Sequence, residues 1–91
     1  MKNVYLVINE WANEEASYTS ITVFEKHEDA RKEMQKQIEQ EINENMTGAF
    51  ENGEVIDGFC VDEGVDCWEC WEDSYCVDNH VTIRIEKKEV L

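Results

Sequence analysis

The chain has 91 residues, and its 22 acidic residues outnumber its 8 lysines and arginines, so the formal net charge is −14. This length fits one domain, residues 1–91, with a small core. Such a negative charge argues against direct binding to nucleic acid or to an anionic membrane and favours a basic partner. The apolar run at residues 4–8 is too short for a signal peptide or a transmembrane helix. We therefore expect a cytoplasmic protein with reduced cysteines.

The negative charge is concentrated in residues 37–83. This stretch holds thirteen of the 22 acidic residues and contains no lysine or arginine, whereas residues 1–36 carry seven acidic and five basic residues. All four cysteines and two of the three tryptophans lie in the same stretch. Any function that depends on charge is therefore expected to reside there.

Strands are predicted wherever apolar and polar residues alternate. The alternation predicts a hairpin from strands at 4–10 and 18–24, a weak short strand at 55–61, a better strand at 65–71 and the clearest at 80–86. In the last strand Val81, Ile83 and Ile85 are expected to point inward. In the strand at 65–71 each face carries a tryptophan, a cysteine and acidic residues, so neither is expected to be a plain core face.

A helix is predicted from residue 28 to about residue 46. Its apolar residues recur at every fourth position and form one stripe: Ala30, Met34, Ile38, Ile42 and Met46. Gly48 is expected to end the helix in the left-handed conformation. The element order is then β-β-α-(β)-β-β, which predicts an α+β fold with one helix packed on a small antiparallel sheet.

The cysteines raise the possibility of a zinc site. Four ligands of this kind suit a tetrahedral zinc ion, so a small zinc-binding module is an alternative reading; the candidate ligands are Cys60, Cys67, Cys70 and Cys76. Cys67 and Cys70 lie in a strand-like run, however, and residues three apart in a strand point to opposite faces. Neighbouring carboxylates would also raise the pKa of a redox dithiol rather than lower it. We expect free thiols and no cofactor.

Catalytic signatures are sparse. With 22 acidic residues in the chain, pairs of carboxylates arise freely, and the sequence has two histidines and no glycine-rich phosphate loop. We therefore predict that the protein is not an enzyme.

The acidic surface itself is the main candidate for function. Carboxylates on one face of a strand repeat every ~6.5–7 Å, comparable to the spacing of phosphates along a nucleic-acid strand, so such a surface can occupy a groove built for DNA or RNA. Trp68 is expected to add an exposed aromatic anchor. The predicted partner-binding residues are Glu39, Glu41, Glu44, Asp62, Glu63, Asp66, Trp68, Glu69, Glu72 and Asp73. The alternative is a solvated acidic face on an accessory domain with no specific partner, its tryptophans in the core.

Four segments resemble a class of known proteins: SITVF at 20–24, EDARKEM at 28–34, WEDSY at 71–75 and NHVTIRI at 79–85. Together they are similar to short accessory proteins of bacteriophages and mobile elements, among them the anti-CRISPR inhibitors. The resemblance implies a cytoplasmic inhibitor in a bacterial host that blocks a nucleic-acid site on an RNA-guided nuclease or other nucleic-acid enzyme. It identifies no active site, and the cysteine cluster departs from it.

Overall fold

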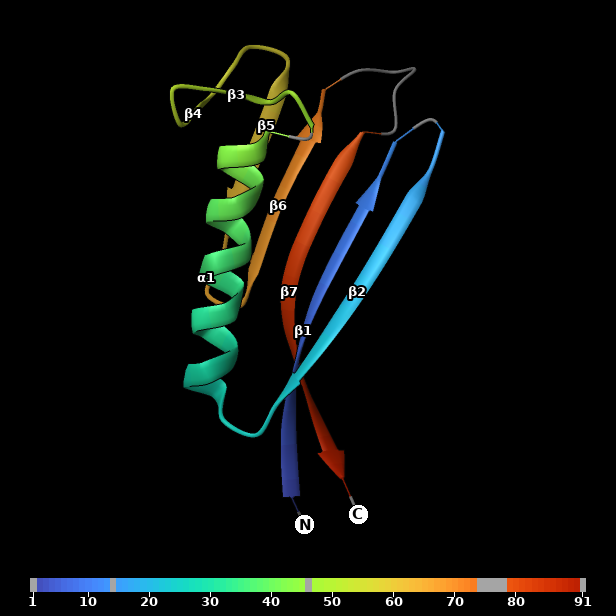
Figure 1. Ribbon diagram of the computed structural model, residues 1–91, viewed down its shortest axis with the longest axis vertical. Helices are drawn as coiled ribbons and strands as arrows, with labels where there is room; N and C mark the ends of the chain where they lie inside the picture. Colours follow the sequence, from blue (N-terminus) through green and yellow to red (C-terminus); the bar gives the residue numbers. More distant parts are fainter. Residues whose placement is uncertain (1, 14, 46, 74–78, 91) are drawn as a thin grey trace.

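The computed structural model describes residues 2–13, 15–45, 47–73 and 79–90. Its elements follow one another as β1 (Lys2–Ala12), β2 (Ser17–Phe24), α1 (His27–Glu44), β3 (Phe50–Glu51), β4 (Glu54–Val55), β5 (Phe59–Glu63), β6 (Cys67–Glu72) and β7 (His80–Val90) (Figure 1). Five strands form an antiparallel sheet in the order β2-β1-β7-β6-β5, and β3 and β4 form a separate two-stranded hairpin. The predicted α+β fold, with one helix on a small antiparallel sheet, is confirmed.

The core lies between α1 and one face of the sheet. The helix contributes Ala30, Met34 and Ile38 from the predicted stripe, and Ile42 packs against them at its edge. From the sheet, Val81 and Ile83 of β7 are 1% and 0% exposed, which confirms the inward face predicted for that strand. The fifth position of the predicted helix stripe, Met46, lies outside the described residues.

The helix ends before the predicted glycine. Asn45 adopts the left-handed conformation at φ 51°, directly after the last helical residue, Glu44. Its side-chain amide donates to the carbonyl oxygen of Phe50 at 2.8 Å, and its side-chain oxygen accepts from the backbone N–H of Phe50 at 2.9 Å. Asparagine tolerates this conformation better than most residues, and the two hydrogen bonds hold the chain as it turns toward β3. Gly48, at φ 74°, belongs to the turn that follows.

The weak strand predicted at 55–61 is divided into two pieces. Gly58 takes φ 92°, a conformation that side chains disfavour, and it separates β4 from β5. The chain therefore leaves the β3–β4 hairpin and turns before it joins the edge of the main sheet.

One face of β6 is a core face, contrary to the prediction that neither would be. Trp68 is 2% exposed and Cys70 is fully buried on the helix side, where Trp68 stacks on Phe50 with ring centroids 6.3 Å apart. The acidic residue of that face, Glu72, is the last residue of the strand and stays half-buried. Its position at the strand end lets one face combine a carboxylate with a packed core.

The opposite face of the sheet carries no helix in the part of the chain that the structure describes. The strand register places Ile8 of β1 between Ile21 of β2 and Arg84 of β7 on this open face. Arg84 forms salt bridges with Glu10 at 2.8 Å and with Glu86 at 3.6 Å. The middle of the open face thus holds one cation shared by two carboxylates, whereas Ile21 is 57% exposed near the edge of the face.

Candidate functional site

Most of the lysines and arginines lie toward one end of the long axis of the molecule. The start of β1 and the end of β7 lie toward the same end of the molecule as the start of α1 (Figure 1), so Lys2, Lys87 and Lys88 lie at that end of the sheet. Lys26, Arg31 and Lys32 lie in the first turns of the helix or just before them, and the last helical turn contains no basic residue. The opposite end of the molecule therefore receives acidic residues without matching cations.

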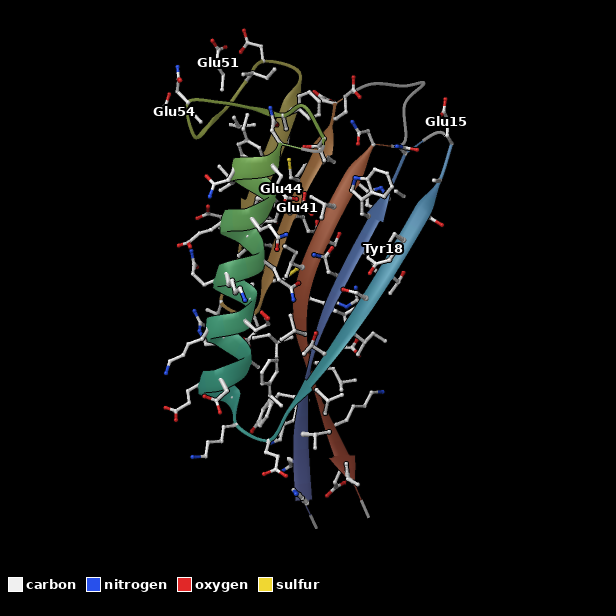
Figure 2. The ribbon with its side chains drawn as sticks, in the orientation of Figure 1. Glu15, Tyr18, Glu41, Glu44, Glu51 and Glu54 are labelled. Atoms are coloured by element: carbon white, nitrogen blue, oxygen red, sulfur yellow. The ribbon has the colours of Figure 1, made fainter. Side chains whose placement is uncertain are left out.

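We call this opposite end of the molecule the acidic end. It gathers carboxylates from the end of α1, the β3–β4 hairpin, the turn before β5 and the end of β6, namely Glu41, Glu44, Glu51, Glu54, Asp57, Glu72 and Asp73. Figure 2 shows Glu41, Glu44, Glu51 and Glu54 at this end. Glu51 and Glu54 are direct partners across the β3–β4 hairpin. A hydrogen bond from the backbone N–H of Asp73 to the backbone oxygen of Gly58 joins the residue after β6 to the turn before β5.

No salt bridge among the described residues neutralises a carboxylate of the acidic end. The salt bridges among the described residues use other acidic groups: Glu25 with Lys2, Asp66 with His27 and Arg31, and Glu10 and Glu86 with Arg84. Five members of the acidic end are exposed, and Glu41 and Glu72 are half-buried. The end thus presents an uncompensated negative potential toward any approaching molecule.

A groove adjoins the acidic end between α1 and the strands β1 and β2. Its volume is about 540 Å³, and its lining combines two aromatic rings with polar and charged side chains: Asn9, Trp11, Tyr18, Ser20, Glu33, Lys36, Gln37, Gln40, Glu41 and Glu44. Tyr18 lies across from Glu41 and Glu44, because β2 diverges from the helix toward this end (Figure 2). From α1, the groove is lined by three carboxylates, on Glu33, Glu41 and Glu44, and by one ammonium group, on Lys36.

Three polar atoms buried along this groove lack a hydrogen-bond partner among the described residues. They are the indole nitrogen Nε1 of Trp11 and one carboxylate oxygen, Oε2, on each of Glu33 and Glu41. Partial burial raises the pKa of Glu41, and the charge of Glu44 raises it further. A buried unpartnered donor or acceptor is costly, so these atoms are suited to binding a polar ligand group.

The predicted partner-binding residues do not form one continuous surface. Glu41, Glu44, Glu72 and Asp73 meet at the acidic end, whereas four others lie elsewhere: Asp62, Glu63, Asp66 and Glu69. The antiparallel register explains the split, because Phe59 pairs with Glu72 at one end of β5 while Glu63 pairs with Trp68 toward the other.

Individual members of the predicted set also differ in their surroundings. Glu39 is exposed on the outer side of α1, and Glu69 lies opposite Asp62 on the open face. Asp66 is not a free anion, because its carboxylate contacts His27 Nε2 at 3.0 Å and Arg31 Nη1 at 3.3 Å. These contacts tie the β5–β6 turn to the start of the helix.

Trp68 is not an exposed anchor, and that prediction is wrong. Its ring is buried under α1 because strand alternation places it on the same face as Cys70, toward the helix. Trp71 is 36% exposed on the open face and is the better candidate for a surface aromatic on β6. Tyr75, in the segment that the resemblance rests on, lies outside the described residues.

The zinc alternative finds no assembled site in the described part of the chain. Cys60 and Cys67 lie on the open face, whereas Cys70 is buried on the helix side, and among the described residues no three metal-ligating side chains come together. Cys76 lies outside the described residues. Burial raises the pKa of Cys70 to about 11, and burial followed by the charge of Glu69 raises the pKa of Cys67. Both thiols are therefore held in the protonated form at neutral pH.

Sequence reasoning missed the hairpin carboxylates and the groove. The signal for the hairpin was present, since Asn52-Gly53 is a strong two-residue turn that sets Glu51 against Glu54. In the observed β1–β2 hairpin, Trp11, which lies one residue beyond the predicted strand at 4–10, pairs with Tyr18. The alternation of apolar and polar residues does not show that α1 covers only part of the sheet face that carries Trp11 and Tyr18, so the groove could not be predicted.

No protein-family model matches the chain, and neither curated proteins nor solved structures provide a match. In the described residues, no helix is both long and apolar enough to cross a bilayer.

Proposed function

We propose that the protein is an interaction protein whose acidic end binds a basic surface of a partner protein. The observation that carries this proposal is the gathering of seven carboxylates at one end of the fold, with no salt bridge to any of them among the described residues. Leaving so many like charges together costs stability through mutual repulsion. A cationic partner surface would relieve that repulsion on binding.

The partner class follows from the chemistry of the acidic end. A surface rich in lysine and arginine that already accepts a polyanion is the natural complement, and nucleic-acid enzymes carry such surfaces. An RNA-guided nuclease is the proposed partner, with the protein acting as an anti-CRISPR-like mimic of DNA or RNA. Complementary charge speeds the encounter and selects the register of the complex, and salt screens both effects.

Competition for DNA tests the proposal. The protein is titrated into a panel of guide-loaded RNA-guided nucleases that hold a labelled target duplex, at low and at high salt. We expect at least one nuclease to release the duplex at low salt and to retain it at high salt. The double variant Glu51→Gln/Glu54→Gln should displace DNA less well than the control Asp62→Asn/Glu63→Gln, which removes the same charge away from the acidic end. Equal release of the duplex at low and high salt, or no release from any nuclease of the panel, would contradict the proposal.

A further inference from the structure

The two edges of the main sheet differ in a way that points to a binding site. Both β2 and β5 are edge strands. β5 has five residues, ends in Asp62-Glu63 and lies against the β3–β4 hairpin, features that discourage pairing with another chain. β2 has eight residues, SYTSITVF, and none is charged, although a third of the whole chain is charged.

The free edge of β2 is also rich in residues that favour strand pairing. Tyr18, Ile21 and Val23 are 62%, 57% and 58% exposed, and the strand contains no proline or lysine. Its outer row of backbone N–H and C=O groups has no partner strand among the described residues. An edge of this length without such protection is a template for an added strand.

The groove described above lies on one side of that edge. Tyr18 and Ser20 line it from β2, and three carboxylates, on Glu33, Glu41 and Glu44, line it from the helix. Eleven residues of helix separate the first and last of these, which is about 16 Å at the helical rise. An extended chain covers that distance in about five residues, with side chains on one face repeating every ~6.6–7 Å.

We propose that an extended segment of the partner pairs with the β2 edge as a sixth strand and places basic side chains in the groove. This inference rests on the proposed function and specifies the form that the basic partner takes. Residues of the added strand on the groove side face Glu33, Glu41 and Glu44, and one buried oxygen on each of Glu33 and Glu41 has no hydrogen-bond partner among the described residues. Residues on the opposite side face Ile21 and Val23. The segment therefore alternates basic and apolar residues.

A defined peptide provides the test. A labelled eight-residue peptide of alternating arginine and valine, capped at both ends, is titrated into the protein at low salt. We expect binding to protect backbone amides on the outer edge of residues 17–24 from hydrogen exchange. The same peptide N-methylated at its central amides keeps every charge and loses its backbone donors, so its affinity should fall by at least about tenfold, the equivalent of ~1.4 kcal/mol.

Matched variants separate the edge from general electrostatics. Ile21→Lys places a repelling charge on the edge and should weaken peptide binding by at least about tenfold, ~1.4 kcal/mol. Val65→Lys makes the same change in charge at a site that is 73% exposed and distant from β2, and it should have a small effect. Glu41→Gln should weaken binding of the arginine peptide more than Glu54→Gln, because only Glu41 lines the groove.

The possible contrary results are distinct. Equal binding of the N-methylated peptide, with no protection of β2, would overturn the edge site and leave the proposed basic partner standing. Failure of both peptides to bind at low salt would contradict both proposals. A dimer in sedimentation whose β2 amides are protected without peptide would show that a second copy occupies the edge, which overturns the proposed occupant.

Discussion

Truncation of Trp68 tests whether its ring packs in the core or lies on the surface of the protein. The ring is 2% exposed and stacks on Phe50 at an interplanar angle of 18°. Replacing a buried tryptophan by alanine costs about 3–5 kcal/mol, because it removes the buried area and leaves a cavity. A domain of this size loses roughly 4–8 °C of Tm for each kcal/mol, so Trp68→Ala should lower Tm by at least about 12 °C.

A second substitution at the same position sharpens the prediction. The indole Nε1 of Trp68 is buried without a hydrogen-bond partner in the described residues, and such a group costs about 1–3 kcal/mol. Trp68→Phe removes this unpartnered donor together with part of the ring, so the two effects oppose one another. We expect a loss of less than about 2 kcal/mol for Trp68→Phe.

Urea denaturation followed by circular dichroism measures both variants against wild type. The control is Trp71→Ala, on the same strand but 36% exposed, which should cost about 1 kcal/mol or less. A Trp68→Ala variant as stable as the Trp71→Ala variant would refute the placement of Trp68 in the core. If Trp68→Ala does not fold, a stable Trp68→Phe variant still distinguishes a packing role from a surface role.

Three further predictions concern the helix end, the groove and the hairpin. Asn45→Ala removes both hydrogen bonds to Phe50 and puts alanine at positive φ, so urea denaturation should show a free energy of unfolding that is lower by about 2–3 kcal/mol. Asn45→Gly should lower it less, because glycine tolerates positive φ. The pKa of Glu41 is raised in the folded protein, so the folded state holds the proton of this carboxyl group more tightly than the unfolded state. The free energy of unfolding therefore falls as the pH rises from the unfolded-state pKa of Glu41 through its folded-state pKa. Glu41→Gln should therefore be more stable than wild type at pH 7, with the difference disappearing in acid below both pKa values; an equal difference at both pH values would contradict the burial of this carboxylate. Glu51→Lys replaces a like-charge pair with Glu54 by an opposite-charge pair and should stabilise the protein by about 0.5–1 kcal/mol in thermal denaturation, less at high salt, whereas an unchanged or lower Tm would count against the hairpin register.

The periodic parts of the fold were predictable from the sequence for a clear physical reason. The stripe at Ala30, Met34 and Ile38 and the alternation at Val81 and Ile83 each repeat with the period of one element, and those residues form the core. Positions with conflicting local signals were less predictable. Burial of one face of the β6 strand depends on where the helix lies, and the sequence of that strand alone contains no such information.

The candidate site was only partly predictable because linear clustering of charge does not specify spatial clustering. Glu41 and Glu44 were predicted and do reach the acidic end, but Asp62 and Glu63 were predicted with them and lie toward the other end of β5. The two strands of an antiparallel hairpin run in opposite directions, so residues that are close in the sequence can lie toward opposite ends of the molecule. The carboxylates of the acidic end therefore come from the ends of α1 and β6, from the turn before β5 and from the β3–β4 hairpin.

Asp66 also shows that the position of a charge in the sequence does not determine its surroundings in the fold. Asp66 belongs to the acidic stretch in sequence, yet the β5–β6 turn brings it against His27 and Arg31 at the start of α1. The ion pair removes one predicted anion from the available surface. A charge pattern in the sequence thus predicts a charged surface, and the fold determines which of its carboxylates have no salt bridge among the described residues.

The most direct test of the acidic end as the binding surface is the salt dependence of partner affinity. Kd for a responsive RNA-guided nuclease is measured over a range of salt concentrations for wild type, Glu51→Gln/Glu54→Gln and Asp62→Asn/Glu63→Gln. We expect a steep loss of affinity with salt for wild type, a shallower slope for the acidic-end variant and a slope parallel to wild type for the other variant. Three identical slopes, or an affinity that salt does not change, would contradict the account.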